Sequence, residues 1–165
     1  MTLSDQVPFC TLPRLVQSFP PDARASLMGS SAAPALSGEV LFWQTDLGVV
    51  CQVCFAGLPR SSRGCGFFAL HIHNGTACTG EPAFADALGH YNPGDLPHPC
   101  HAGDLLPVLA VGQWAYSVFL TDRFHLQEVL GKAVILHAGA DDFTSQPAGN
   151  AGERLACGLI EKAAP

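Results

Sequence analysis

The sequence predicts an all-β protein, an antiparallel sandwich or barrel of seven to eight short strands with long loops. Three observations support this fold class. The 165-residue chain has 17 glycines and 13 prolines, which favours many turns over long helices. Short segments rich in branched and aromatic residues recur between those turns. Only 13% of the residues are charged and 48% are hydrophobic, which suits one well-buried core.

The predicted strands follow one another in short steps along the chain. A first strand is expected over Ala25–Met28. Residues 38–44 and 49–55 are expected to form a hairpin around the turn Asp46-Leu47-Gly48. The remaining strands are expected over 67–73, 115–121, 132–137 and 155–160, and residues 124–130 form a helical turn or an irregular connection.

The chain is divided into an N-terminal extension, residues 1–20, whose role stays open, and one domain, residues 21–165. The extension contains three prolines and has no basic start followed by a long apolar run, so it does not resemble a signal peptide. No window approaches a membrane span. The default expectation is therefore a cytoplasmic protein without a membrane partner, with the periplasm or the extracellular space as the alternative.

The charges are unevenly distributed. A net charge of −6 argues against nucleic acid or an anionic membrane as a partner. No lysine or arginine occurs from Gly64 to Asp122, a stretch that holds five acidic residues and five of the seven histidines. A segment rich in His and Asp without cationic side chains suits the binding of a metal cation.

The histidines gather in a strand and in the long loop that follows it. His71 and His73 alternate along the predicted strand, so both imidazoles face the same side. The loop from Asn74 to Leu106 has little strand character, and loops of that length are either functional or disordered. Three nitrogens and one carboxylate oxygen, a set that zinc prefers, come from four residues of this loop: His90, His98, His101 and Asp104. The pattern indicates a metal site, with two metals.

Three blocks of the sequence resemble the copper/zinc superoxide dismutases. Residues Ala69–His73 are similar to the copper-binding strand of that family. Residues His90–Pro93 and His101–Leu105 resemble its zinc loop, and Gly149–Gly158 resembles its C-terminal signature. The likeness extends from about residue 24 to residue 162, and the three blocks come in the order of the family.

The resemblance implies a Greek-key barrel with copper and zinc as cofactors. It assigns His71, His73, His90 and His137 to copper, and it assigns His90, His98, His101 and Asp104 to zinc. His90 would then be shared between the two metals. By the same resemblance, Asp141 would be the carboxylate that joins the two sites, Arg154 would guide the substrate anion, and Cys78 and Cys157 would form a disulfide.

The implied activity is conversion of superoxide to oxygen and hydrogen peroxide by cycling of copper between Cu(II) and Cu(I) next to a structural zinc. Arg154 and His90 would be the catalytic residues. The alternative is a non-catalytic copper- and zinc-binding protein for storage or delivery on the same fold. Arg154 argues against pure storage, because a metal store needs no anion guide. The sequence leaves the oligomeric state open, with a homodimer as one alternative.

The cysteines leave further questions. Only Pro99 and Cys100 separate His98 from His101, so Cys100 could replace one of the zinc histidines. Cys51 and Cys54 are three positions apart in a predicted strand and are expected to face opposite sides, which argues against a shared metal. The redox state of the Cys78 and Cys157 thiols in the cell also stays open.

Overall fold

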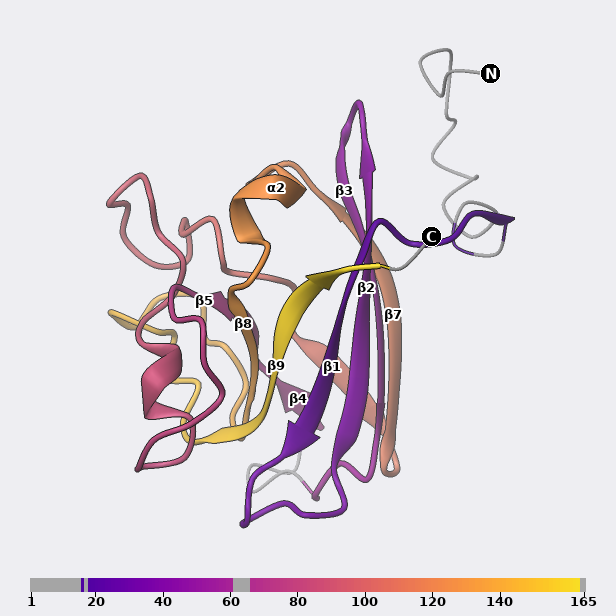
Figure 1. Cartoon of the computed structure of the whole chain (residues 1–165). Coiled ribbons are helices and arrows are strands. Elements are labelled where there is room, and N and C mark those ends of the chain that lie inside the picture. The colour runs from indigo at the N-terminus through magenta and orange to yellow at the C-terminus, as the bar shows by residue number, and fades with distance from the viewer. Residues whose placement is uncertain (1–15, 17, 61–65, 164–165) are drawn as a thin grey trace.

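The protein is described from a computed structural model that covers residues 16, 18–60 and 66–163 (Figure 1). Most of the extension expected over residues 1–20 lies outside the described residues, as do Cys10 and Cys65. Within these residues, nine strands form one antiparallel sheet that curls into a nearly closed barrel. The predicted all-β fold class is therefore confirmed.

The strands agree closely with the sequence prediction. They are β1 (Ala23–Gly29), β2 (Ser37–Thr45), β3 (Gly48–Ala56), β4 (Phe67–Phe68), β5 (Leu70–His73), β6 (Val108–Val111), β7 (Trp114–Thr121), β8 (Ala133–His137) and β9 (Arg154–Lys162). The predicted hairpin is present, since Thr45 pairs with Gly48 across a two-residue turn. The described residues also include two short helices, η2 (Ala85–Ala87) and α2 (Leu126–Val129), the latter within the segment expected as a helical turn.

Two strands differ from the prediction. The single strand expected over residues 67–73 is broken at Ala69, whose N–H donates to the Gly139 carbonyl (2.8 Å) and whose carbonyl accepts from the His137 N–H (2.9 Å). At Ala69 the chain changes its pairing partner, since β4 pairs with β6 and β5 pairs with β8. The second difference is β6, which was not predicted because its four residues follow Pro107 and give too short a pattern.

The order of the strands in the sheet is β4-β6-β7-β3-β2-β1-β9-β8-β5. Because β3 pairs with β7 and β1 pairs with β9, the chain crosses between parts of the barrel, as a Greek key requires. The two strands at the ends of this order, β4 and β5, are consecutive in the chain. Ala69 therefore connects the two end strands of the sheet through the main chain.

The interior of the barrel is filled with apolar side chains, and the long loops lie outside it. The largest fully buried side chains include Phe42, Phe55 and Phe68. Residues 74–107 and 138–153 lie together beside β5 and β8, at the left of Figure 1. Among the described residues, no helix has the length and apolar character needed to cross a membrane.

The loop after residue 90 covers the outer edge of β5. Ile72 donates its N–H to the Gly103 carbonyl, and its own carbonyl accepts from the Tyr91 N–H, both at 2.8 Å. The Leu105 N–H donates to the Leu70 carbonyl at 3.2 Å. A Cβ atom at residue 103 would lie 2.2 Å from the Ile72 oxygen, so this close approach requires glycine. The loop is thus bound to the strand that carries His71 and His73.

Candidate metal centre

The first cluster consists of four histidines from three parts of the chain. His71 and His73 lie on β5, His90 lies in the long loop, and His137 ends β8. One ring nitrogen of each lies within 4.8 Å of the others. The four side chains are almost fully buried, which removes water as a competing partner. The fold therefore brings together the four residues that the family resemblance assigned to copper.

Backbone carbonyls fix two of these rings. The Nδ1 atom of His73 lies 2.8 Å from the Leu88 carbonyl oxygen, and Nδ1 of His137 lies 3.2 Å from that of Gly152. A carbonyl only accepts, so both Nδ1 atoms carry the hydrogen and both Nε2 atoms keep a free lone pair. The two Nε2 atoms are 3.3 Å apart. They are thus presented to the same point.

The second cluster consists of His90, His98, His101 and Asp104. Nδ1 of His90 lies 2.8 Å from Oδ1 of Asp104 and 3.2 Å from Nδ1 of His101. Nδ1 of His98 lies 3.0 Å from Oδ2 of Asp104, without the alignment of a hydrogen bond. Three nitrogens and one oxygen converge, a donor set that suits four-coordinate zinc.

His90 belongs to both clusters. Its Nδ1 faces the second cluster, while its Nε2 is buried without a hydrogen-bond partner. The Nδ1 atoms of His71 and His98 are also buried without one. Such an orphaned group costs about 1–3 kcal/mol. Two metal ions, one in each cluster, would satisfy all three atoms, so the residues fit two metals that share one imidazole.

Asp141 binds one histidine of each cluster. Its two oxygens lie 2.8 Å from Nε2 of His71 and 2.8 Å from Nε2 of His98. Burial alone would raise the pKa of Asp141, but hydrogen bonds from His71, the Phe143 N–H and His98 lower this pKa to about 2. The ionised carboxylate can only accept, so both histidines donate from Nε2 and turn a bare Nδ1 toward the metals.

Burial also keeps the first cluster neutral. Desolvation, followed by the nearby His137, lowers the pKa of His73 to about 2. Desolvation, followed by the nearby His71, lowers the pKa of His137 to about 3. The positive charge of Arg154 contributes to both shifts, which indicates that the guanidinium lies close to these rings. Neutral imidazole is the form that binds a metal, so the site is prepared for one.

Arg154 begins β9 and is held by the loop that precedes His90. Its guanidinium donates to the carbonyls of Phe84 and Leu88. Cys78, in the same loop, forms a disulfide with Cys157 of β9, with the two Cα atoms 5.6 Å apart. The pairing that the resemblance implied is therefore present, and it ties the loop to the strand that carries the arginine.

The other cysteines of the described residues, Cys51, Cys54 and Cys100, belong to neither cluster. Cys100 is exposed, and His98, not Cys100, lies with the second cluster. Cys51 is buried and Cys54 is exposed, as expected for opposite faces of β3. Sequence reasoning missed Gln146 and Arg123, which hydrogen bond to the backbone around His98. No local pattern in the sequence could have revealed those contacts.

The fold and the site together define a two-metal β-barrel protein in which one imidazole is common to both metal clusters. The family model described as copper/zinc superoxide dismutase (SODC) matches residues 36–160 of the chain. The chain belongs to the copper/zinc superoxide dismutase family, which makes it a superoxide dismutase with copper and zinc as its metals.

Individual relatives agree with this assignment. The chain is 32% identical over 158 residues to superoxide dismutase [Cu-Zn] 2 of Aquifex aeolicus, covering 87% of this chain and 90% of that protein. It is 32% identical over 162 residues to the superoxide dismutase [Cu-Zn] of Deinococcus radiodurans, covering 86% and 85%. The extracellular superoxide dismutase [Cu-Zn] of Mus musculus is 36% identical over 140 residues, covering 77% of this chain and 54% of that protein.

Proposed function

We propose that the first cluster binds copper, that the second binds zinc, and that the pair dismutates superoxide. Two superoxide anions and two protons give one oxygen molecule and one hydrogen peroxide molecule. The observation that supports this assignment best is the position of His90 in both clusters, with Nε2 in the first and Nδ1 in the second. When bound, copper supplies the one-electron exchange and zinc supplies a fixed positive charge beside His90.

The protein supplies the geometry for this reaction. His71, His73 and His137 are held by a carboxylate and two carbonyls, so their lone pairs converge on one point without rearrangement. Burial excludes water from these rings. The donor set of the first cluster is therefore rigid, which suits an ion whose charge changes during turnover.

Arg154 and His90 are the two residues that we assign to catalysis. The guanidinium of Arg154, fixed by two carbonyls beside the first cluster, attracts the superoxide anion and orients it. His90 holds a proton at Nε2 and gives it to the reduced oxygen species. No protein group accepts a hydrogen bond from Nε2 of His90, so a proton on this atom can be donated only toward the first cluster.

We also propose that two copies of the chain associate through the outward face of β4, β6 and β7. Five apolar side chains are between 39% and 77% exposed on this face: Phe67, Leu109, Val111, Trp114 and Tyr116. The strand register places Phe67 beside Leu109 and Val111 beside Trp114, so the apolar surface is continuous. Contiguous aromatic and aliphatic patches of this kind mark protein interfaces.

The assignment is tested with His137→Gln, and His125→Gln serves as the matched control because His125 caps α2 outside both clusters. Metal content per chain and superoxide consumption are measured on metal-loaded protein. We expect wild type and control to hold one copper and one zinc and to be active. His137→Gln should keep zinc and lose more than about a hundredfold in copper affinity and activity. Wild-type protein that holds both metals without turnover would favour the storage alternative.

A further inference from the structure

The segment 98–104 supplies three of the four ligands of the second cluster without regular secondary structure of its own. His98, His101 and Asp104 all lie in seven residues of turns and bends. Only two residues separate His98 from His101, so the backbone must direct two imidazoles to one point within a single turn. Such a short segment is held in place only if something outside it binds its backbone.

Gln146 holds the start of this segment. Its side-chain oxygen accepts from the His98 N–H at 3.0 Å, and its side-chain nitrogen donates to the His98 carbonyl at 2.7 Å. Both backbone groups of His98 are therefore bound by one amide from the loop 138–153. Asp141, in the same loop, binds the ring of His98. The loop thus fixes both the backbone and the imidazole of this residue.

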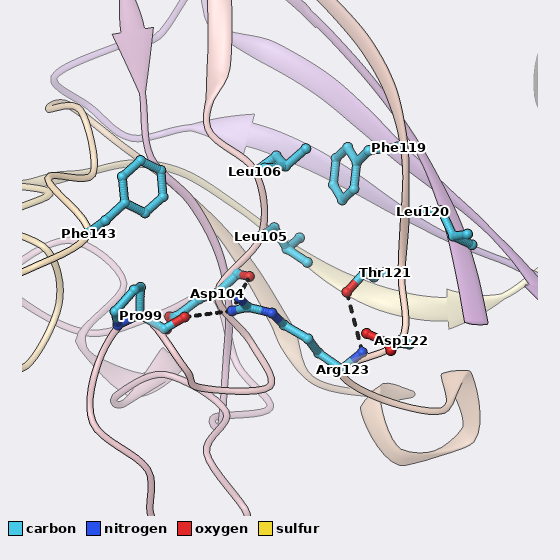
Figure 2. A pocket seen from close by; sticks show the side chains of 10 residues that line it. All are labelled: Pro99, Asp104, Leu105, Leu106, Phe119, Leu120, Thr121, Asp122, Arg123 and Phe143. Atoms are coloured by element: carbon cyan, nitrogen blue, oxygen red, sulfur yellow. Dashed lines mark hydrogen bonds between the residues drawn. The ribbon is translucent and has the colours of Figure 1, made fainter. Parts of the chain in front are cut away.

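Arg123 binds three further carbonyls of this segment, in addition to the bonds that join Gly103 to Ile72 and Tyr91. Its Nη1 donates to the carbonyl of Pro99 at 2.7 Å and lies 3.2 Å and 3.3 Å from the carbonyls of Asp104 and His101. Figure 2 shows the side chain reaching from the end of β7 to Pro99 and Asp104, along the wall of a cavity of about 290 Å³. One guanidinium nitrogen thus draws three carbonyls of a single turn together.

We propose that Gln146 and Arg123 are positioning residues that preform the zinc half of the metal centre by fixing the backbone of residues 98–104. This inference rests on the zinc assignment of the second cluster. The hydrogen bonds of Arg123 are charge-assisted, which makes them stronger than neutral ones. Gln146 makes two hydrogen bonds to one residue, His98. Outer contacts that orient metal ligands commonly change metal affinity by about 10–100-fold.

The experiment uses the full-length, disulfide-intact, metal-free protein with cobalt(II) as the probe of the second cluster. The variants are Arg123→Met and Gln146→Met, which keep side-chain length and remove the hydrogen bonds. The matched controls are Arg24→Met on β1 and Gln127→Met on α2, both at exposed positions away from the clusters. Cobalt affinity is measured by competition with a chelator, its absorption spectrum reports the ligand geometry, and thermal unfolding of the metal-free protein reports the fold.

We expect each methionine variant to bind cobalt about 10–100-fold more weakly than wild type, with an altered spectrum, while metal-free unfolding stays within the range of the controls. Arg123→Lys should restore part of the affinity. Gln146→Glu, which keeps the acceptor for the His98 N–H and loses the donor, should be intermediate. If a methionine variant fails to fold, these two conservative variants decide the question.

Wild-type affinity and spectrum in both methionine variants would overturn the inference and leave the proposed function intact. A loss of affinity with an unchanged spectrum and a lowered metal-free unfolding temperature would also overturn it, because a general loss of stability explains that result. Failure of the wild-type protein to bind cobalt at the second cluster would overturn the zinc assignment and this inference together.

Discussion

His71 and His98 are bonded to the same carboxylate, although one belongs to the first cluster and the other to the second. Each Nε2 lies 2.8 Å from one oxygen of Asp141. The carboxylate therefore sets the tautomer of a histidine in each cluster. A residue at position 149 with a Cβ atom would place that atom 2.1 Å from Oδ1 of Asp141, so Gly149 is needed for this arrangement.

Asp141→Asn tests this connection. The asparagine amide nitrogen can only donate, so one of the two histidines must accept at Nε2 and turn an N–H toward its metal. We expect metal affinity at the affected cluster to fall about 10–100-fold, measured by chelator competition for copper and zinc separately. Asp46→Asn in the exposed β2–β3 turn is the control. Unchanged affinity at both clusters would contradict the tautomer argument.

The rate of superoxide dismutation should depend strongly on Arg154 and only weakly on ionic strength. The loop 138–153 contains no lysine or arginine, so Arg154 is the nearest cation that follows His137 in the chain. Arg154→Met should lower the rate about tenfold or more, and Arg154→Lys should lower it less. Pulse radiolysis between low and physiological salt should show a shallow decline for wild type. A steep decline would mean that distant charges steer the substrate.

The metal-free protein should lose stability as the pH falls below about 6.5. In the folded state burial lowers the pKa of His73 to about 2 and that of His137 to about 3, from an ordinary value of 6.5. Between those values only the unfolded chain binds the protons, so acid favours unfolding, by up to about 1.4 kcal/mol per pH unit for each histidine. The stabilisation is complete above about pH 6.5 and decreases toward pH 3.

Urea unfolding of the metal-free protein at several pH values measures this slope. Burial also lowers the pKa of His71 and His101, so four histidines contribute to the slope. His137→Gln removes one of them, so its free energy of unfolding should depend less steeply on pH than that of wild type. A pH dependence that His137→Gln leaves as steep as in wild type would show that other groups carry the effect.

Removal of the disulfide should destabilise the protein and release the loop that holds Arg154. Cys78 and Cys157 are separated by 79 positions, and closure of a loop of that size is worth about 4.5 kcal/mol in the chain-entropy account. The double change Cys78→Ser with Cys157→Ser should lower the free energy of unfolding by roughly that amount. Cys54→Ser, at an exposed free thiol, is the control. Hydrogen exchange should report faster opening of residues 74–89 in the double variant.

The association of two copies is tested with Trp114→Glu, which places a charge within the exposed apolar face. Sedimentation equilibrium should give a dimer for wild type and a monomer for the variant, because an unpaired charge in a buried interface is costly. Leu47→Glu, at an exposed apolar residue in the β2–β3 turn, should stay dimeric. A wild-type monomer at micromolar concentration would rule out the proposed interface.

Much of the barrel could be predicted from local patterns, and the residues of the two clusters could be predicted from a local pattern together with the resemblance to a family. Alternation and turn residues marked seven strand segments, and the spacing of His90, His98, His101 and Asp104 marked one cluster. The break at Ala69 and the roles of Gln146 and Arg123 could not be predicted. They depend on hydrogen bonds between residues 19 to 70 positions apart, which only the folded chain brings together.

The binding of the histidine loop to β5 affects how the protein meets other copies of itself. A strand at the rim of a sheet offers unpaired N–H and C=O groups to any extended chain nearby. Here the amide and carbonyl of Ile72 are already taken by Gly103 and Tyr91, from the same loop whose histidines form the second cluster. The loop that carries these histidines therefore also covers the backbone of β5 at Ile72, and it leaves no open edge there for a strand of another molecule.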